Sequence, residues 1–242
     1  MNTLNNFFFI GLPYIAIAIF LIGTIIRYKV QKFKISSLSS QFLEGEKLFW
    51  GSIPFHWGLL FLFFGHLAAF LIPESIILWN SNPLRLLLLE ISSFVFAICV
   101  FIGLIILFIR RILDDRVRIM TTKMDVFIGL LLLFEIFSGM YTAVFLRWGS
   151  SWGASVMSPY MKSIFTFTPD IAAISAMPLM FRLHVIGAFL VVLMVPFTRL
   201  VHFLVYPLNY LWKPYQQVIW NWNKKKVRDP KTKWTIHRPK NN

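Results

Sequence analysis

Two apolar stretches decide the fold: IPFHWGLLFLFFGHLAAFLI at residues 53–72 and LMFRLHVIGAFLVVLMVPFTRLVHFLVY at residues 179–206. Each is long enough to cross the hydrocarbon core of a bilayer as a helix, which takes ~20 residues. Each stretch also carries two histidines, which are His56 and His66 in the first and His184 and His202 in the second. Because histidine is costly in hydrocarbon, two on each of two segments indicate a bound group or a functional role.

The composition of the whole chain is that of a polytopic membrane protein. Of its 242 residues, 57% are hydrophobic and 14% are charged, and the mean hydropathy is +0.68. A soluble domain is about a quarter charged. Five apolar runs are predicted to span the membrane, at residues 7–26, 53–72, 86–109, 126–146 and 179–206. Since a lone strand cannot satisfy its backbone in lipid, we predict an all-α integral membrane bundle of five transmembrane helices.

The distribution of positive charge along the chain indicates its membrane topology. The net charge is +14, and 19 of the 24 Lys and Arg residues fall in three blocks, at 27–47, 110–123 and 213–240. Each block borders an apolar run, so the positive-inside rule explains them better than nucleic-acid binding does. The opposite side has only Arg85, Arg147, Lys162 and Arg182. We predict an outside N-terminus and a cytoplasmic C-terminus in the cytoplasmic (inner) membrane. The connection at 147–180 is predicted to be irregular or interfacial, over the outer face.

In this topology the two histidine-bearing spans run antiparallel, which pairs His56 with His202 near the cytoplasmic side and His66 with His184 near the outer side. For straight helices the two histidines of each pair would not lie at the same depth in the membrane. The ten residues from His56 to His66 rise ~15 Å, whereas the eighteen from His184 to His202 rise ~27 Å. Unequal tilt and a bend at Pro196 are expected to absorb the difference. Nearby small residues are expected to leave room for a flat macrocycle, and these are Gly58, Gly65 and Gly187.

The pairing favours two haem b groups, each bound by one histidine from each span. Two protein ligands fill both axial positions of the iron, which leaves electron transfer as the chemistry. The alternatives are histidines that are hydrogen-bonded within the bundle or relay protons, in a haem-free anchor or transporter. The single cysteine, Cys99, cannot build an iron–sulfur or zinc site. Any iron–sulfur cluster must therefore belong to a partner.

The residues around these histidines resemble the gamma subunit of respiratory nitrate reductase, a dihaem cytochrome b. The similarity extends from the N-terminus to about residue 216. The motifs are Pro13-Tyr14-Ile15-Ala16, Phe55-His56 with Gly58, Gly65-His66, Phe181-Arg182-Leu183-His184 and Arg199-Leu200-Val201-His202. The resemblance implies a dihaem membrane domain at 1–212, and the remaining residues 213–242 are expected to form a basic cytoplasmic tail.

The resemblance also implies the partners. Quinol is oxidised near the outer haem, and electrons pass to the inner haem and on to an iron–sulfur beta subunit in the cytoplasm. A molybdenum-containing alpha subunit then reduces nitrate to nitrite. The alternative is a related dihaem, quinone-linked subunit of a sulfur-metabolism or heterodisulfide-reductase-like complex.

Three further side chains are candidates for function. The family has a quinol-binding lysine early in the third span, and the chain departs from the family by having Leu86 there. Our hypothesis is that Arg85, one residue earlier and ~100° around the helix, extends to the same place and binds quinol. The alternative for Arg85 is a topology charge at the outer rim. Arg199, one turn before His202, is the preferred partner of a haem propionate. Glu135 lies in the middle of the fourth span, where an ionisable group is a functional candidate unless it is simply hydrogen-bonded in the bundle.

Overall fold

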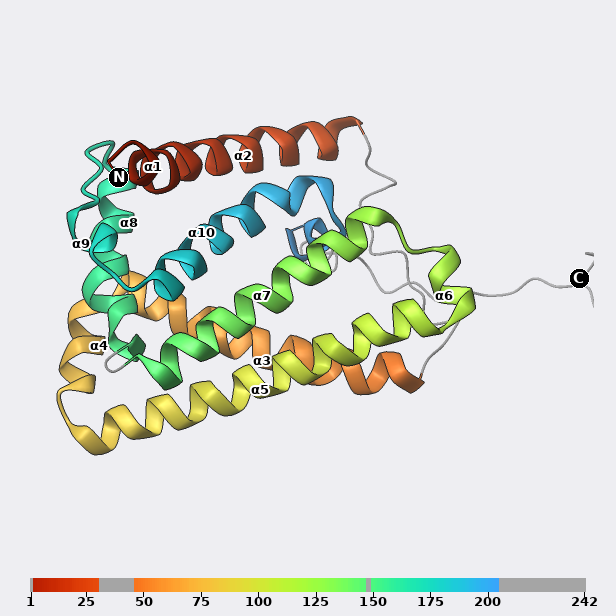
Figure 1. Cartoon of the computed structure of the whole chain (residues 1–242), viewed down its shortest axis with the longest axis horizontal. Helices are drawn as coiled ribbons and strands as arrows, with labels where there is room; N and C mark the ends of the chain where they lie inside the picture. The colour runs from red at the N-terminus through yellow and green to blue at the C-terminus, as the bar shows by residue number, and fades with distance from the viewer. Residues whose placement is uncertain (1, 31–45, 147–148, 205–242) are drawn as a thin grey trace, which may run out of the picture. The chain divides into compact units, whose positions relative to one another are not determined.

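The computed structural model describes residues 2–30, 46–146 and 149–204 (Figure 1). This part of the chain is helical and contains no strand. The predicted tail at 213–242 and the boundary before it lie outside the described residues, as does Arg147.

Within the described residues, five helices are long and apolar enough to cross a bilayer, which agrees with the predicted number of spans. They cover Thr3–Val30, Lys47–Leu71, Pro83–Leu113, Lys123–Phe145 and Leu179–Phe197. Only 11% to 33% of the most apolar window of each span is buried inside the chain, so most apolar side chains face outward. An exterior this apolar is typical of a membrane protein, because so large an apolar surface is unfavourable in water.

The elements along the chain are long helices joined by short ones. The N-terminal span joins α1 (Asn2–Asn6), the π-helical turn η1 (Phe7–Gly11) and α2 (Leu12–Val30). The central helices are α3 (Glu46–Leu71), α4 (Pro73–Asn80), α5 (Pro83–Leu113), α6 (Asp115–Ile119) and α7 (Lys123–Phe145). The rest comprises η3 (Gly149–Ser151), η4 (Gly153–Met157), α8 (Ser158–Phe165), α9 (Ala172–Ser175), α10 (Leu179–Met194), η5 (Val195–Phe197) and η6 (Arg199–Val201).

Local sequence explains where two of the long helices begin. The Asn82 side chain accepts hydrogen bonds from the first turn of α5, and Pro83 follows at a position where proline is tolerated. At the start of α7, Thr122 and Asp125 form a capping box, in which each side chain bonds the backbone N–H of the other. These caps satisfy backbone N–H groups that have no carbonyl partner one turn earlier in the helix.

Helices α3 and α5 pack closely along their length because small residues face each other. A Cβ on Gly58 would lie 2.6 Å from Cγ2 of Val100 and 2.7 Å from the carbonyl oxygen of Phe96. Gly103 is equally tight against Gly51. Small residues at such contacts let helix backbones approach in membrane proteins. The expectation that Gly58 leaves room for a macrocycle is therefore wrong, since α5 occupies that space.

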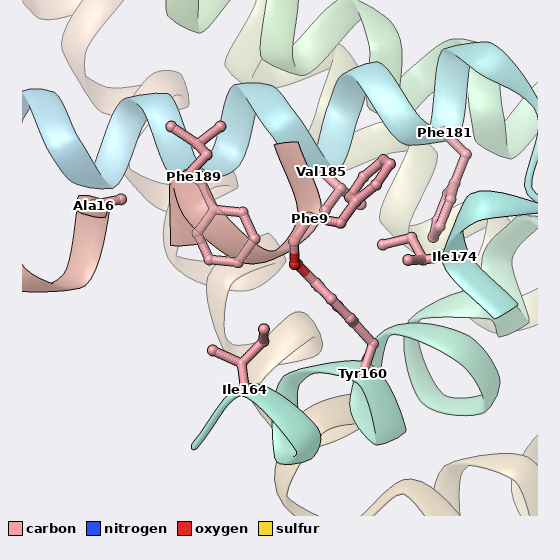
Figure 2. Close-up of a cluster of buried hydrophobic side chains, with 9 residues drawn as sticks. Phe9, Ala16, Tyr160, Ile164, Ile174, Phe181, Val185 and Phe189 are labelled. Atoms are coloured by element: carbon pink, nitrogen blue, oxygen red, sulfur yellow. The ribbon is translucent and has the colours of Figure 1, made fainter. Parts of the chain in front are cut away.

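The connection after α7 is more ordered than predicted. It forms η3, η4, α8 and α9, and apolar side chains of α8 and α9 join a buried cluster with the N-terminal turns and α10 (Figure 2). The Tyr160 hydroxyl donates to the carbonyl oxygen of Phe9 at 2.6 Å. Burial, and to a lesser extent the neighbouring Tyr14, raises the pKa of Tyr160, which keeps this donor protonated. The signal in the sequence was the spacing of four between Tyr160 and Ile164, both buried in α8.

The fifth span is not one continuous helix, which corrects the predicted helix over 179–206. Helix α10 ends at Met194, and the 3₁₀ turns η5 and η6 follow with an extended residue, Thr198, between them. The chain then turns back toward α3 (Figure 1). Pro196 cannot donate an N–H to a continuing helix and its ring clashes with the preceding turn, which accounts for the break.

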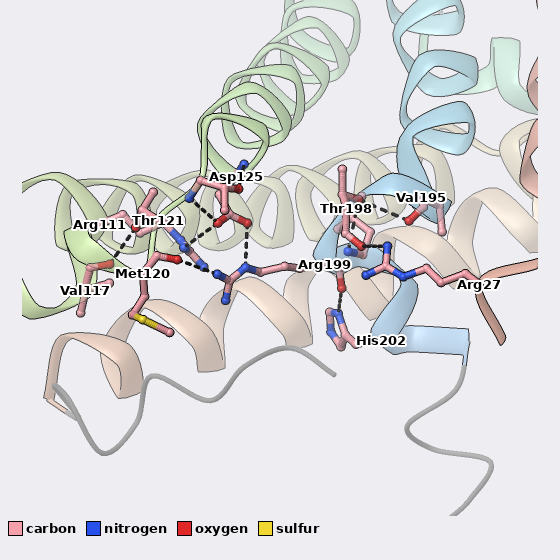
Figure 3. A network of polar contacts seen from close by, with 12 residues as sticks. Arg27, Arg111, Val117, Met120, Thr121, Asp125, Val195, Thr198, Arg199 and His202 are labelled. Carbon is pink, nitrogen blue, oxygen red and sulfur yellow. Dashed lines mark hydrogen bonds and ion pairs between the residues drawn. The ribbon is translucent and has the colours of Figure 1, made fainter. Parts of the chain in front are cut away.

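Helix α2 stabilises this break. The Arg27 guanidinium donates to the carbonyl oxygens of Pro196 and, at 3.1 Å, of Thr198 (Figure 3). Gly23, one turn earlier, lies against the Pro196 ring, where a Cβ would come within 2.9 Å. Carbonyl groups released by a helix break need partners inside a membrane, and Arg27 supplies them.

Candidate functional site

The structure brings the four histidines together in two pairs. His56 of α3 and His202, which follows η6, have ring centroids 6.3 Å apart with an interplanar angle of 73°. His66 of α3 and His184 of α10 have ring centroids 6.5 Å apart with an angle of 44°. These are the pairs expected from antiparallel spans. The break at Pro196 allows His202 to meet His56, because residues beyond it no longer continue along α10.

The spacing within each pair fits an iron atom between the rings. A histidine nitrogen binds a metal at ~2 Å, so two imidazoles on opposite sides of one metal have centroids roughly 6 Å apart. Both observed separations, 6.3 Å and 6.5 Å, match this value. Direct hydrogen bonding between the rings would need a nitrogen–nitrogen distance of about 3 Å, and no such bond joins the rings of either pair.

Every one of the four Nδ1 atoms lies within hydrogen-bond distance of a backbone carbonyl oxygen. The acceptors are Ser52 for His56 at 2.7 Å, Leu62 for His66 at 2.7 Å, Glu135 for His184 at 3.0 Å, and Arg199 for His202 at 2.6 Å. A carbonyl oxygen can only accept, so each Nδ1 carries the proton and each Nε2 keeps its lone pair. This tautomer is the one that lets a histidine bind a metal through Nε2.

His184 has more partners than the other three histidines. Its Nδ1 also lies 3.1 Å from the Ser138 hydroxyl and 3.2 Å from Oε1 of Glu135. Ser138 is fully buried and donates its own proton to the Glu135 carbonyl oxygen at 2.9 Å, so it can accept from His184. Both partners come from α7, whereas the other histidines bond within their own segments.

A network of charged groups lies beside His202 (Figure 3). The buried carboxylate of Asp125 accepts from Nε of Arg199 at 2.7 Å and pairs with Arg111 at 3.6 Å. Arg199 also donates to the carbonyl oxygen of Met120 at 3.0 Å. Since the Arg199 carbonyl oxygen accepts from His202, these contacts tie the His202 ring to the start of α7. The contact of Arg199 with a haem propionate stays a prediction.

Arg85 lies in the first turn of α5 and is exposed. Its guanidinium carbon lies 5.3 Å from the centroid of the Trp79 ring, and the Trp79 indole N–H donates to the Arg85 carbonyl oxygen at 3.3 Å. Leu86, at the position of the family lysine, is buried. The two side chains therefore differ in direction, and the quinol role of Arg85 stays a prediction.

The sequence reasoning missed the partners of the histidines. Neither Asp125 nor Ser138 was predicted to contribute to the site. A signal was available for Ser138, because two polar residues three apart, Glu135 and Ser138, share one face of an apolar span.

Comparisons with known proteins agree with this geometry. Residues 5–221 match the family model described as nitrate reductase gamma subunit. The chain is 36% identical over 208 residues to the nitrate reductase gamma chain of Bacillus subtilis strain 168, covering 84% of this chain and 93% of that one. It is 32% identical over 222 residues to the respiratory nitrate reductase 1 gamma chain of Escherichia coli K12, covering 90% and 98%. A nitrate reductase-like protein, NarX of Mycobacterium tuberculosis, is 28% identical over 88% of this chain and 34% of its own length.

Proposed function

The chain belongs to the nitrate reductase gamma subunit family, and from this premise we propose that it is the cytochrome b subunit that oxidises quinol for nitrate respiration. It passes electrons through two b haems to a cytoplasmic iron–sulfur beta subunit. Nitrate is then reduced to nitrite on a molybdenum-containing alpha subunit. The family membership itself places the chain in a complex with other nitrate reductase subunits.

One observation carries the proposal: two histidine pairs at metal-bridging separation, all with the tautomer that leaves Nε2 available. Gamma subunits of nitrate reductase are cytochromes of the b type, which agrees with bis-histidine binding. His56 and His202 would hold one haem, and His66 and His184 the other.

The chain's own residues position the two sites along the membrane normal. His56 and His66 are ten residues apart on α3, which separates them by ~15 Å. A haem at each pair would supply a one-electron carrier, and this separation is short enough for electrons to pass between the two.

The quinol site is proposed at the His66 end, which lies outside in the predicted topology of an inner-membrane protein. Arg85 is the candidate there for a hydrogen bond to the quinol oxygen. Its side chain can reach along the surface while its charge stays near water. Loss of quinol protons at this side, with electrons moving to the other, would make the reaction electrogenic.

The relatives also bear on the terminal acceptor. The three relatives described above carry nitrate reductase in their names, which supports nitrate over the alternative, a sulfur-metabolism complex.

A reduced-minus-oxidised spectrum of the purified complex tests the proposal. We expect a b-type α-band, two haems per gamma chain by extraction, and reduction of both by added quinol. Absence of the α-band would reject the haem assignment. Haems that are present but that quinol does not reduce would reject the quinol role alone.

A further inference from the structure

Glu135 is a buried carboxyl group that lies against one of the two histidine pairs. Its side chain in the middle of α7 is 15% exposed, and Oε1 lies 3.2 Å from Nδ1 of His184. The second oxygen, Oε2, is buried and has no hydrogen-bond partner among the described residues. A carboxyl group is costly at such a place in a membrane, so its presence there indicates a role.

Two glycines make room for this contact. A Cβ on Gly187 of α10 would overlap Oε2 of Glu135, and a Cβ on Gly139 of α7 would come within 3.0 Å of Cε1 of His184. The contact surface of α7 and α10 is therefore shaped around the carboxyl group and the ring. The prediction that Gly187 leaves room for a macrocycle is therefore wrong, because Glu135 fills that space.

No other histidine of the two pairs has a carboxylate partner within the part of the chain that the structure describes. His56, His66 and His202 bond to carbonyl oxygens of their own segments, and His56 has in addition the Ser52 hydroxyl at 3.1 Å. A carboxylate oxygen within ion-pair distance of Nδ1–H, as Oε1 of Glu135 is at 3.2 Å from His184, makes the other ring nitrogen a stronger donor to a metal. Stronger donation stabilises oxidised iron more than reduced iron, which lowers the reduction potential.

We propose that Glu135 is a positioning residue for His184, which fixes the ring and lowers the midpoint potential of the haem bound between His66 and His184. The inference rests on the proposed haem ligation and goes beyond it, since it assigns to one site a control of potential that the other lacks. A lower potential at this haem favours transfer of its electron to the next carrier.

The test is a redox titration of the purified complex that carries Glu135→Gln, followed at the α-band and by electron paramagnetic resonance. Glutamine keeps the size of the side chain and removes the carboxylate. We expect the potential of the His66–His184 haem to rise by an amount equal to about a tenfold change in its reduced-to-oxidised ratio, ~59 mV for one electron. The other haem should keep its potential.

Glu90→Gln is the matched control, because Glu90 is also a carboxyl group within a span, but it accepts from Ser150 at 2.5 Å and forms no ion pair with a histidine among the described residues. We expect neither potential to move in this variant. An equal shift in both variants would overturn the inference, since it would show a general effect of lost charge.

The outcomes separate this inference from the proposed function. If the unmodified complex contains no b haem, the proposed function fails; if both haems are present and E135Q leaves both potentials unchanged, only the role of Glu135 fails. Should E135Q not retain the haem, Glu135→Asp, which keeps the carboxylate but withdraws it from His184, decides the matter. A raised potential in E135D supports the role, and an unchanged one overturns it.

Discussion

The two histidine pairs have similar ring separations but are built in different ways. At His56–His202, both Nδ1 atoms bond to carbonyl oxygens three or four residues earlier in the same segment, and the break at Pro196 brings the rings together. At His66–His184, the partners of His184 come from another helix, α7. In the first pair both rings are thus bonded by their own segments, whereas in the second the His184 ring depends on the packing of α7 against α10. Each of the two histidine pairs should therefore be disturbed by different substitutions.

The largest expected effect is the loss of one haem when a ligand is removed. His184→Ala and His66→Ala should each reduce the haem content by about half and leave the same spectral component, because bis-histidine iron needs both axial ligands. His56→Ala and His202→Ala should leave the other component. Pyridine haemochrome assays and low-temperature spectra measure both. If H184A and H56A removed the same component, the two sites would not be separate.

A smaller effect is expected when the charged network beside His202 is broken. Asp125→Ala removes a capping group and leaves Arg199 and Arg111 without their carboxylate, which should cost roughly 3 kcal/mol of stability. The haem at His56–His202 should be retained less well than the other haem. Thermal denaturation in detergent and spectra after gel filtration measure the two effects.

Asp115→Ala is the control for this variant, since Asp115 pairs with Arg118 at 2.8 Å but is 80% exposed. Exposed ion pairs contribute ~0–1 kcal/mol, so this variant should behave almost like the unmodified chain. A D125A chain as stable as D115A would contradict the assignment of Asp125 as an anchor.

Two glycines near the histidines on α3 should respond differently to the same substitution. Gly58→Ala places a methyl group against Val100 and the Phe96 backbone, which should cost about 1–3 kcal/mol. Gly65→Ala meets nothing within 4 Å, so the apolar bundle should keep its thermal stability. Any change in G65A should be confined to the spectrum of the haem at His66. Equal destabilisation of the two variants would show that α3 and α5 do not pack as described.

The smallest effect is expected for Arg85→Ala. Its contact with the Trp79 ring contributes ~0.5–1 kcal/mol, so stability and haem content should change little. Reduction of the haems by quinol should slow, with a higher KM for quinol, while reduction by dithionite stays fast. Normal quinol-driven reduction in R85A would remove Arg85 from the mechanism.

The sequence predicts much of this molecule because its strongest signals are one-dimensional. Apolar runs of membrane length locate the five spans, and the histidines within two of them lead to the pairs. The turn at Thr198 was not predicted in detail, since it depends on Arg27 and Gly23 of a helix far away in the sequence. The partners of His184 could not be predicted for the same reason. The spacing of Glu135 and Ser138 shows that they share one face of α7, but the packing against α10 that places them beside the ring is not visible in the local sequence.

The central claim is that each iron is bound by one histidine of α3 and one of the segment after residue 178. A cryo-electron microscopy map of the complete complex tests it most directly. The account predicts two planar densities, one between the Nε2 atoms of His56 and His202 and the other between those of His66 and His184. A map in which a haem is bound through Nδ1, or joins histidines of different pairs, would contradict it.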